Sequence, residues 1–503
     1  MDKNYNYVIV GTGPTGLALA WFLAKENKTV LLIDKETSIG GCHRVQRVNG
    51  LFTEHGPRVY SDVYLNFIKM LEEMNLNFND LFTLYDFDIS NIGNKKLKFF
   101  EKFALIKAFI KLVFNPIYGQ DISMKTFMNN NSFSPESIDY LERVCRLTDG
   151  AQTERYTLFQ FLQLINNQSL YKLYQPTIPN DDGLFFHIQN KLIETKQITF
   201  LLNHEVVDLY NQDKYINEIN VIDKSTSHEY IIKGDKFILA LPPKQLNKLI
   251  LHSQIKNAFG NSDVISKWSD NNSYFDYIPI TLHWKNKIKL PKIWGFPASD
   301  WGLAFIVLSN YMTFDRQIEL QNSNLVISTA ITFTDRKSSF TKKTANESNI
   351  NEVCLEVLRQ LRLSYPDLPY PDSMLMSPQV YKDASGKWIN SDTAFVSTPD
   401  KNQYISFKSQ IYNNLYNCGA HNGKSKYHFT SMETAIANAI SLFNKLEPNA
   451  IHKRYIKEYK QITNTVHVGI ILVLILIGLV LYRDKIYNFF SDIYYKLKEK
   501  YNI

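Results

Sequence analysis

The feature that most constrains this chain is a glycine-rich turn near its start, between a predicted strand and a predicted helix. Residues 5–10 read YNYVIV, a short β-branched run typical of a buried parallel strand. Residues 11–16, GTGPTG, follow with the spacing G-x-G-x-x-G, and residues 17–27 carry apolar side chains at helical spacing. A second apolar run, residues 29–34, ends in Asp34. This complete strand–turn–helix–strand unit predicts an α/β domain with a parallel sheet.

The three glycines of this turn have separate structural roles. Gly11 permits the tight turn, Gly13 lets backbone N–H groups approach a pyrophosphate, and Gly16 allows the helix to pack against the strand. Asp34 lies 18 residues after Gly16, where its carboxylate can accept hydrogen bonds from both hydroxyls of a ribose. A purely structural turn would leave the acid unexplained, so the pattern predicts dinucleotide binding. The cofactor-binding residues assigned from this unit are Gly11, Gly13, Thr15, Gly16, Asp34 and Lys35.

Composition excludes several other classes of protein. With 45% hydrophobic and 21% charged residues, the 503-residue chain is ordinary globular protein of two to four domains. A net charge of +7 is weak for this size, and no Lys/Arg block indicates nucleic-acid binding. The four cysteines lie far apart without a CxxC pair, so neither a disulfide framework nor a metal site is predicted, and a reducing compartment is favoured.

Further along the chain, helical and strand patterns alternate in blocks. Residues 62–175 are mostly helical in pattern, and residues 184–243 contain one helix followed by three strands. Residues 250–400 hold several strands and one amphipathic helix, and residues 412–446 end in another helix. No internal repeat is present.

Residues 8–41, VIVGTGPTGLALAWFLAKENKTVLLIDKETSIGG, resemble the start of FAD-containing oxidoreductases of the amine oxidase superfamily. This superfamily includes flavin amine oxidases, protoporphyrinogen oxidase, carotenoid desaturases and UDP-galactopyranose mutase. Its Gly-Gly pair after the second strand corresponds here to Gly40 and Gly41. Three later segments resemble the family pattern as well, namely HEVVDLY, FILALPP and LYNCGAHNGKSKYHFTSMETAIANAI.

The resemblance implies an FAD site built from distant parts of the chain. Val206 corresponds to the strand whose backbone contacts adenine, and Gly419 precedes a helix whose N-terminus meets the flavin. The cofactor residues implied by the family are Gly41, Val206, Gly419, Met432 and Glu433. No cysteine occupies a convincing attachment position, so noncovalent FAD is expected. The chain departs from the family where Cys42 and His43 interrupt a Gly-Gly-Arg pattern and where Ala420 replaces the Asp of a Gly-Asp pair.

The segment Thr53–Arg58 contains the candidate catalytic residues, His55 and Arg58. Its Gly-Pro-Arg part is similar to that of protoporphyrinogen oxidase. A histidine ordinarily titrates near neutrality, and Arg58 could hold a substrate anion. The alternative is that Glu54 pairs with Arg58 while His55 is structural. The sequence leaves both interpretations open.

These observations predict an oxidoreductase that removes a hydride from a C–N or C–C bond of a small organic substrate onto flavin N5. A second G-x-G-x-x-G is absent from the sequence, which argues against a built-in NAD(P)H site. One alternative is a carotenoid-desaturase- or UDP-galactopyranose-mutase-like flavoenzyme. An alternative of another class is a non-enzymatic binding protein like the Rab GDP-dissociation inhibitors, which have lost flavin; Gly16 and Gly419 argue against it.

The predicted fold is α/β: a discontinuous Rossmann-like FAD-binding domain with an inserted α+β substrate domain and a C-terminal transmembrane helix. The predicted boundaries are 1–70, 180–250 and 405–450 for the FAD-binding domain, 71–179 and 251–404 for the substrate domain, 466–482 for the transmembrane helix and 483–503 for a short basic tail.

The transmembrane prediction rests on hydropathy. Residues 466–482 are uncharged and almost entirely apolar, about 25 Å as a helix, with Lys and Arg on both sides. A buried C-terminal helix is the alternative. The expectation is a single-pass protein, anchored in the lipid bilayer by its C-terminal helix, with the flavin domain in the cytosol.

Overall fold

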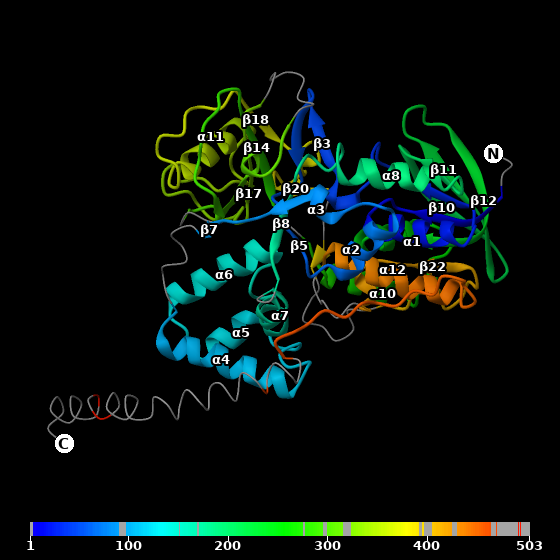
Figure 1. Ribbon diagram of the computed structural model, residues 1–503, viewed down its shortest axis with the longest axis horizontal. Coiled ribbons are helices and arrows are strands. Elements are labelled where there is room, and N and C mark those ends of the chain that lie inside the picture. Colours follow the sequence, from blue (N-terminus) through cyan, green and yellow to red (C-terminus); the bar gives the residue numbers. More distant parts are fainter. Residues whose placement is uncertain are drawn as a thin grey trace.

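The computed structural model describes residues 4–89, 97–149, 151–168, 171–274, 277–294, 299–314, 323–391, 395–396, 405–424 and 430–463, with Gly469, Ser491 and Ile493. Three parts are visible: an α/β part, a second part around an antiparallel sheet, and a group of helices beneath the second part (Figure 1).

The α/β part is built around a mixed sheet with a parallel core. Strand β12 continues from an antiparallel meander into the parallel core, where it lies between β1 and β22. On the other side of β1 the parallel order continues through β2 to β9. The strands are β1 (Tyr5–Val10), β2 (Val30–Ile33), β9 (Ile198–Leu201), β10 (His204–Gln212), β11 (Tyr215–Asp223), β12 (Glu229–Leu239) and β22 (Leu415–Asn417). The predicted Rossmann-like α/β architecture is therefore confirmed.

Alternate residues of β1 belong to two separate cores. Tyr7 and Ile9 pack into the core that holds α1 and α12, whereas Val8 and Val10 pack into the core of the meander. Because both faces are covered, the strand is apolar along most of its length rather than alternating. The helices of this part are α1 (Pro14–Lys25), α8 (Leu184–Glu194), α9 (Pro243–His252), α10 (Ser262–Asn271) and α12 (Met432–Leu446).

The second part surrounds a four-stranded antiparallel sheet of order β16-β17-β14-β18. Its core contains the fully buried indoles of Trp284 and Trp301 and one face of α11. These elements are β14 (Ile278–Trp284), β16 (Leu303–Val307), β17 (Leu325–Ile331), β18 (Ser373–Met376) and α11 (Ile350–Leu361).

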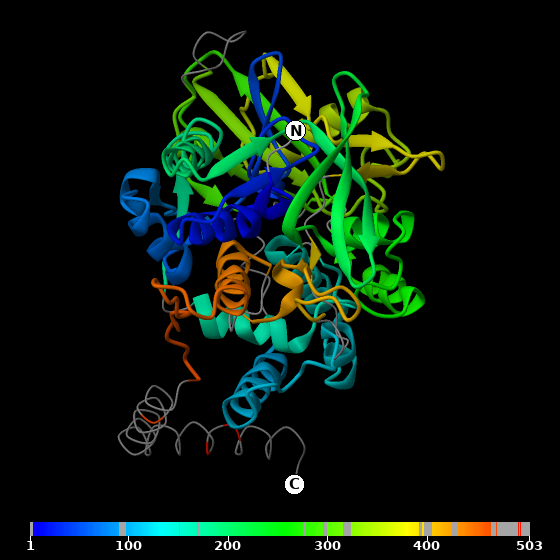
Figure 2. The same cartoon turned by 90° about the vertical axis from the view of Figure 1, so that its right-hand side faces the viewer.

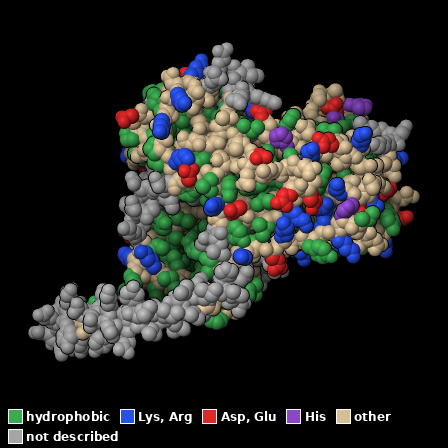
Figure 3. Space-filling model, viewed as in Figure 1, with side chains coloured by type: hydrophobic (Ala, Val, Ile, Leu, Met, Phe, Trp, Pro, Cys, Tyr) green, Lys and Arg blue, Asp and Glu red, His purple; other side chains and the backbone are tan. Residues whose placement is uncertain are grey.

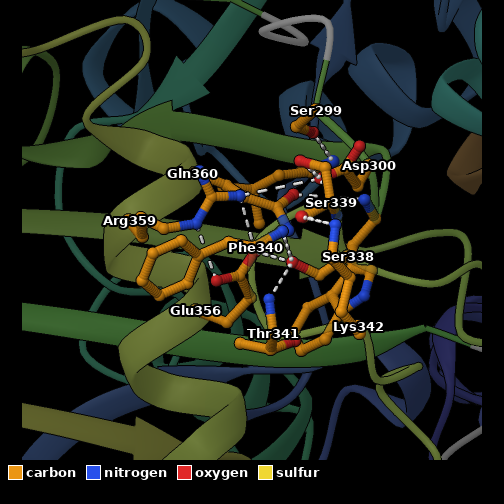
Figure 4. A network of polar contacts seen from close by, with 12 residues as sticks. Ser299, Asp300, Ser338, Ser339, Phe340, Thr341, Lys342, Glu356, Arg359 and Gln360 are labelled. Carbon is orange, nitrogen blue, oxygen red and sulfur yellow. Dashed lines mark hydrogen bonds and ion pairs between the residues drawn. The ribbon is translucent and has the colours of Figure 1, made fainter.

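A polar network fastens α11 to this sheet (Figure 4). The buried carboxylate of Glu356 accepts hydrogen bonds from Ser338 Oγ (2.8 Å), Arg359 Nε (2.7 Å) and Gln360 Nε2 (2.8 Å). Asp300 accepts from the backbone and hydroxyl of Ser339, both at 2.7 Å. Because each carboxylate is bonded within the fold, we interpret this network as structural.

Short strands and small helices connect the two sheets. They are η1 (Gly41–His43), β3 (Val45–Val48), β4 (Leu51–Glu54), β5 (Tyr60–Ser61), α2 (Leu65–Glu73), α3 (Phe78–Leu81), β6 (Phe82–Leu84), β7 (Asp88–Ile89), β8 (Leu173–Pro176), β13 (Ser273–Tyr274), β15 (Ile293–Trp294), η3 (Leu308–Asn310), β19 (Val380–Lys382), β20 (Trp388–Asn390), β21 (Phe395–Val396) and η4 (Ala420–Asn422). The helical group contains α4 (Phe99–Phe114), α5 (Met124–Asn130), α6 (Pro135–Asp149) and α7 (Leu158–Gln168).

Charged side chains of both signs are intermixed on one face of the molecule (Figure 3). On the face displayed in Figure 3, Lys and Arg lie among Asp and Glu. The charge on this face is therefore dispersed.

The predicted transmembrane helix requires a correction. Within the described ranges, no helix is both long enough and apolar enough to cross a membrane. The apolar α4, for example, has 16 residues and carries lysines, whereas a span needs about 20 predominantly apolar residues. The predicted segment 466–482 lies outside the described residues except for Gly469. The membrane-spanning part of the predicted fold, the binding of a lipid bilayer through the C-terminal helix and the tail-anchored localisation are thus not supported.

Gly16 and Gly13 provide a matched pair for testing the turn. A Cβ at residue 16 would overlap the carbonyl oxygen of Gly11, whereas a Cβ at residue 13 would meet only Gly41 Cα at 3.8 Å, an ordinary contact. We expect Gly16→Ala to lower the free energy of unfolding by about 1–3 kcal/mol and Gly13→Ala to leave it nearly unchanged. Denaturant unfolding of the ligand-free proteins measures both, and equal stability of the two variants would contradict this packing.

Candidate functional site

The glycine turn brings the end of β1 against the end of β12. Gly11 has φ +109°, a conformation that favours glycine, and a Cβ there would overlap the carbonyl oxygen of Ala240. The Gly40-Gly41 turn folds over the same place, because Gly40 N–H donates to Thr12 O at 2.9 Å. No side chain caps the N-terminus of α1, which begins directly after Gly13. The first turn of α1 therefore has the geometry of an anion-binding site.

Asp34 ties the end of β2 to this turn. One carboxylate oxygen, Oδ2, accepts hydrogen bonds from the backbone N–H and the hydroxyl of Thr12, both at 2.7 Å. The other oxygen, Oδ1, accepts from Glu36 N–H at 3.0 Å. A carboxylate has about four lone-pair sites, so Asp34 retains capacity for a ribose hydroxyl. Its role as a ribose ligand stays a prediction.

Other predicted cofactor residues lie near the same edge. The start of β10 adjoins Asp34, since His204 N–H donates to Asp34 O at 2.9 Å, and Val206 is buried two residues further on. Thr15 is buried in the first turn of α1, whereas the side chain of Lys35 is half exposed.

The C-terminal motif reaches this edge from the other side. Cys418 N–H donates to Leu239 O at 3.1 Å, next to the Ala240 carbonyl that Gly11 approaches. Gly419 is held by Asn422, which accepts from its N–H at 2.8 Å, and by Asn438 of α12, which donates to its carbonyl at 2.8 Å. The predicted segments, although far apart in sequence, thus meet at the carboxyl ends of three neighbouring parallel strands, where ligands bind in open α/β sheets.

Glu433 has a partner that the sequence did not indicate. Its buried carboxylate accepts hydrogen bonds from the backbone N–H of Asn66 at 3.0 Å and of Phe67 at 3.2 Å, and from the Asn66 side chain. It therefore caps the first turn of α2. Burial raises the pKa of Glu433 to about 7, and the hydrogen bonds to Asn66 and Phe67 oppose that rise. Met432, its neighbour, is buried in the core between α12 and α1.

A buried polar cluster begins immediately after the Gly40-Gly41 turn, and we call it the His43–Arg58 cluster. It comprises His43, Glu54, His55, Arg58, Tyr60 and Asn180. Tyr60 connects two of these groups, since its hydroxyl lies 3.1 Å from His43 Nδ1 and accepts from Asn180 Nδ2 at 2.9 Å. Asn390 Nδ2 lies 3.2 Å from His55 Nδ1. His43, Tyr60 and Asn180 are thus linked to one another, and His55 is linked to Asn390.

Burial sets the protonation states in the cluster. It lowers the pKa of His55 to about 3, with a further lowering from the Arg58 and Arg44 guanidinium groups. It also holds the pKa of His43 well below its usual range. In contrast, burial raises the pKa of Glu54 to about 7, and the nearby Arg58 opposes that rise. Glu54, not His55, is therefore the group whose pKa falls near neutrality.

Arg58 and Glu54 keep unused hydrogen-bonding capacity. Arg58 Nε and Nη2 and Glu54 Oε1 are buried without a hydrogen-bond partner in the described part of the chain. Within the described ranges these atoms do not pair with each other, and Arg58 acts on Glu54 only through its nearby charge. The sequence left open that Glu54 and Arg58 form a simple ion pair, and the structure does not contain that pair. Buried donors and acceptors without partners are costly, so this arrangement fits a site completed by a polar ligand.

Comparisons with known proteins agree with this architecture. Residues 9–74 match the family model described as an NAD(P)-binding Rossmann-like domain. An alignment of 163 residues with UDP-galactopyranose mutase from Mycoplasma genitalium shows 30% identity and covers 27% of this chain and 39% of that enzyme. The chain thus spans only about two-fifths of this relative.

Solved structures similar to this chain include two amine oxidases. Putrescine oxidase aligns with a TM-score of 0.60 at 12% identity, covering 89% of this chain and 100% of the oxidase. Cyclohexylamine oxidase from Brevibacterium oxydans gives 0.56 at 10% identity, covering 88% and 100%. An oxidoreductase from Methanosarcina mazei gives 0.59 at 14% identity, covering 87% and 99%. The chain has the fold of these proteins, which confirms the predicted resemblance.

The raised pKa of Glu54 makes stability depend on pH. The folded state binds this proton more tightly than the unfolded chain, whose carboxyl has the ordinary value of 4.5. The contribution of the Glu54 proton to the free energy of unfolding is therefore fully present below about pH 4.5. It is lost as the pH rises through about 7. We expect Glu54→Gln, which cannot ionise, to be more stable than the parent by about 3 kcal/mol at pH 8 and equal to it near pH 4.

Denaturant unfolding of both ligand-free proteins between pH 4 and pH 8 measures this difference. Glu433 also titrates in this range, so the quantity to follow is the difference between variant and parent rather than either curve alone. A constant difference across the range would show that Glu54 has no raised pKa.

Proposed function

We propose that this protein is an FAD-dependent, amine-oxidase-like oxidoreductase that removes a hydride from a small organic substrate to flavin N5. The observation that carries the proposal is the buried His43–Arg58 cluster with its unpartnered donors, which directly follows the glycine turns. The matches to a Rossmann-like family model and to the fold of two amine oxidases support it.

The residues present fit noncovalent FAD. The uncapped first turn of α1 and the bare Cα of Gly13 leave room for a pyrophosphate, with Gly11, Thr15, Gly16 and Gly41 around it. In this proposal the adenosine half is held by Asp34, Lys35 and Val206, and the flavin half by Gly419 and the start of α12 with Met432 and Glu433. When bound, the flavin supplies the hydride acceptor, so catalysis by the chain is mainly positioning.

The chain's own contribution lies in the His43–Arg58 cluster. Arg58, with buried unpaired N–H groups, orients the substrate by binding an anionic or carbonyl oxygen. His55 is neutral at pH 7 because of its lowered pKa, so it contributes one hydrogen-bond donor or acceptor rather than a charge. Glu54 exchanges a proton near neutrality and is the group best suited to take one from the substrate. Their burial keeps water away from the reacting atoms.

A second candidate is a mutase-like flavoenzyme, favoured by the 30% identity to UDP-galactopyranose mutase. An isomerisation leaves the substrate with no net change in oxidation, whereas an oxidase consumes an electron acceptor. Turnover that bleaches the flavin and depends on an acceptor supports the first candidate. Conversion of a sugar nucleotide without acceptor consumption supports the second.

The cofactor assignment predicts that the purified protein is yellow and releases FAD on acid precipitation, in a ratio near one per chain. Gly13→Ala should lose most of this FAD, because a Cβ would occupy the path of the pyrophosphate while the fold keeps its stability. Absorbance and chromatography of the supernatant measure the ratio. A stable parent protein that neither contains FAD nor takes it up would refute the assignment and favour a non-enzymatic binding protein.

Arg58→Ala should keep FAD but reduce kcat/KM about 10- to 100-fold, the loss of one charge-assisted hydrogen bond to substrate. An anaerobic screen of amines, porphyrinogens and polyenes for flavin bleaching identifies the substrate first. Arg336→Ala is the matched control, since Arg336 is partly exposed and pairs with Asp139 at 2.9 Å. If Arg58→Ala loses FAD or unfolds while the control does not, Arg58 is structural.

A further inference from the structure

Helix α4 carries an exposed apolar stripe that nothing in the described part of the chain covers. Its large side chains recur at the spacing i, i+4, i+7, i+11 and i+15, so they share one face. The exposed members, with their exposed fractions, are Phe99 (76%), Phe103 (58%), Ile106 (56%), Ile110 (49%) and Phe114 (77%), joined by Phe100 (81%) and Ile117 (62%) beside the stripe or just past its end. We call this set the α4 stripe.

The opposite face of α4 already supplies the packing that the fold needs. Ala108 and Leu112 are buried in the core of the helical group. Glu101, 4% exposed, accepts hydrogen bonds from Ser134 N–H (2.8 Å) and Ser137 Oγ (2.6 Å), which fix the start of the helix. The α4 stripe is therefore a second apolar face, against which no described residue of the chain packs closely enough to bury it. Among the described helices of its group, α4 is the outermost in both views (Figure 1 and Figure 2).

The charges of α4 that border the stripe are all positive. At 3.6 residues per turn, Lys102 lies on one side of the stripe, and Lys107 and Lys111 lie on the other. All three lysines are exposed, and the buried Glu101 is the only acid between residues 97 and 117. Phe and Ile on one face with Lys along both borders is the pattern of a helix that lies in a lipid interface, apolar face down, with ammonium groups at the headgroups.

We propose that α4 is an interfacial helix that binds an anionic lipid surface. Its 16 residues measure about 24 Å, and lysines occur along the whole length, so it lies parallel to the surface and does not span the bilayer. Charge argues against a second copy of the chain as the occupant, because pairing two α4 stripes would bring two sets of lysines together without any acid.

Vesicle flotation with the full-length protein tests the proposal. Phosphatidylcholine vesicles with 30% phosphatidylserine should bind the parent about tenfold or more strongly than pure phosphatidylcholine vesicles, with the difference lost at high salt. Phe103→Glu/Ile110→Glu should reduce binding to the mixed vesicles about tenfold or more, and Lys102→Glu/Lys107→Glu should remove the preference for phosphatidylserine.

Val264→Glu is the matched control, since Val264 is 64% exposed in the first turn of α10, outside the α4 stripe. It should bind vesicles as the parent does. Thermal unfolding shows whether Phe103→Glu/Ile110→Glu folds. If it does not fold, Lys102→Glu/Lys107→Glu is the variant that tests the proposal. Vesicle binding that is unchanged in Phe103→Glu/Ile110→Glu would overturn the proposal. So would a parent that does not bind vesicles but forms a dimer, by sedimentation velocity, that the same substitutions dissolve.

Discussion

The close approach of Gly11 to the carbonyl of Ala240 is the contact on which the candidate site depends. It joins the carboxyl ends of β1 and β12 at a distance that no side chain at residue 11 would permit. Gly16, in the first turn of α1, is subject to a similar limit, because a Cβ there would overlap the carbonyl oxygen of Gly11. Its lack of a side chain lets α1 pack against the turn that contains Gly11. Because Cys418 N–H donates a hydrogen bond to Leu239 O, the end of β12 also positions the C-terminal motif. The segments that the proposed function assigns to the pyrophosphate, the ribose and the flavin are thus held together at one strand end.

Hydrogen bonding distinguishes two buried carboxylates in this protein, one with a structural role and one that can exchange a proton. Glu356 is surrounded by donors from Ser338, Arg359 and Gln360 and has its bonding capacity filled by the fold. Glu54 is equally inaccessible but keeps an oxygen without a partner, and its pKa rises to about 7. Glu356 therefore stabilises the packing of α11 in the second part of the molecule. Glu54 retains a proton that can move, which is a property of reactive sites.

Features that depend on residues close together in the sequence could be predicted from it. The glycine spacing, Asp34 and the buried pattern of residues 5–10 are local, so the α/β architecture could be predicted from them. Features set by distant contacts could not. The lowered pKa of His55 depends on burial in a site that includes Asn390, and the capping role of Glu433 depends on Asn66. The membrane-spanning prediction used hydropathy alone, and the structure describes no helix that satisfies it.

The position of β22 has a consequence for how the protein is made. This strand, residues 415–417, pairs with the edge of β12, and the α12 helix that follows packs against α1. During synthesis the first 240 residues therefore leave the end of β12, at residues 237–239, without this partner strand, and one face of α1 without α12. About 175 further residues must leave the ribosome before β22 is available, and about 200 before α12 is complete. Until then an unpaired strand end and an apolar helix face are both exposed in the nascent chain, and such surfaces are prone to aggregation.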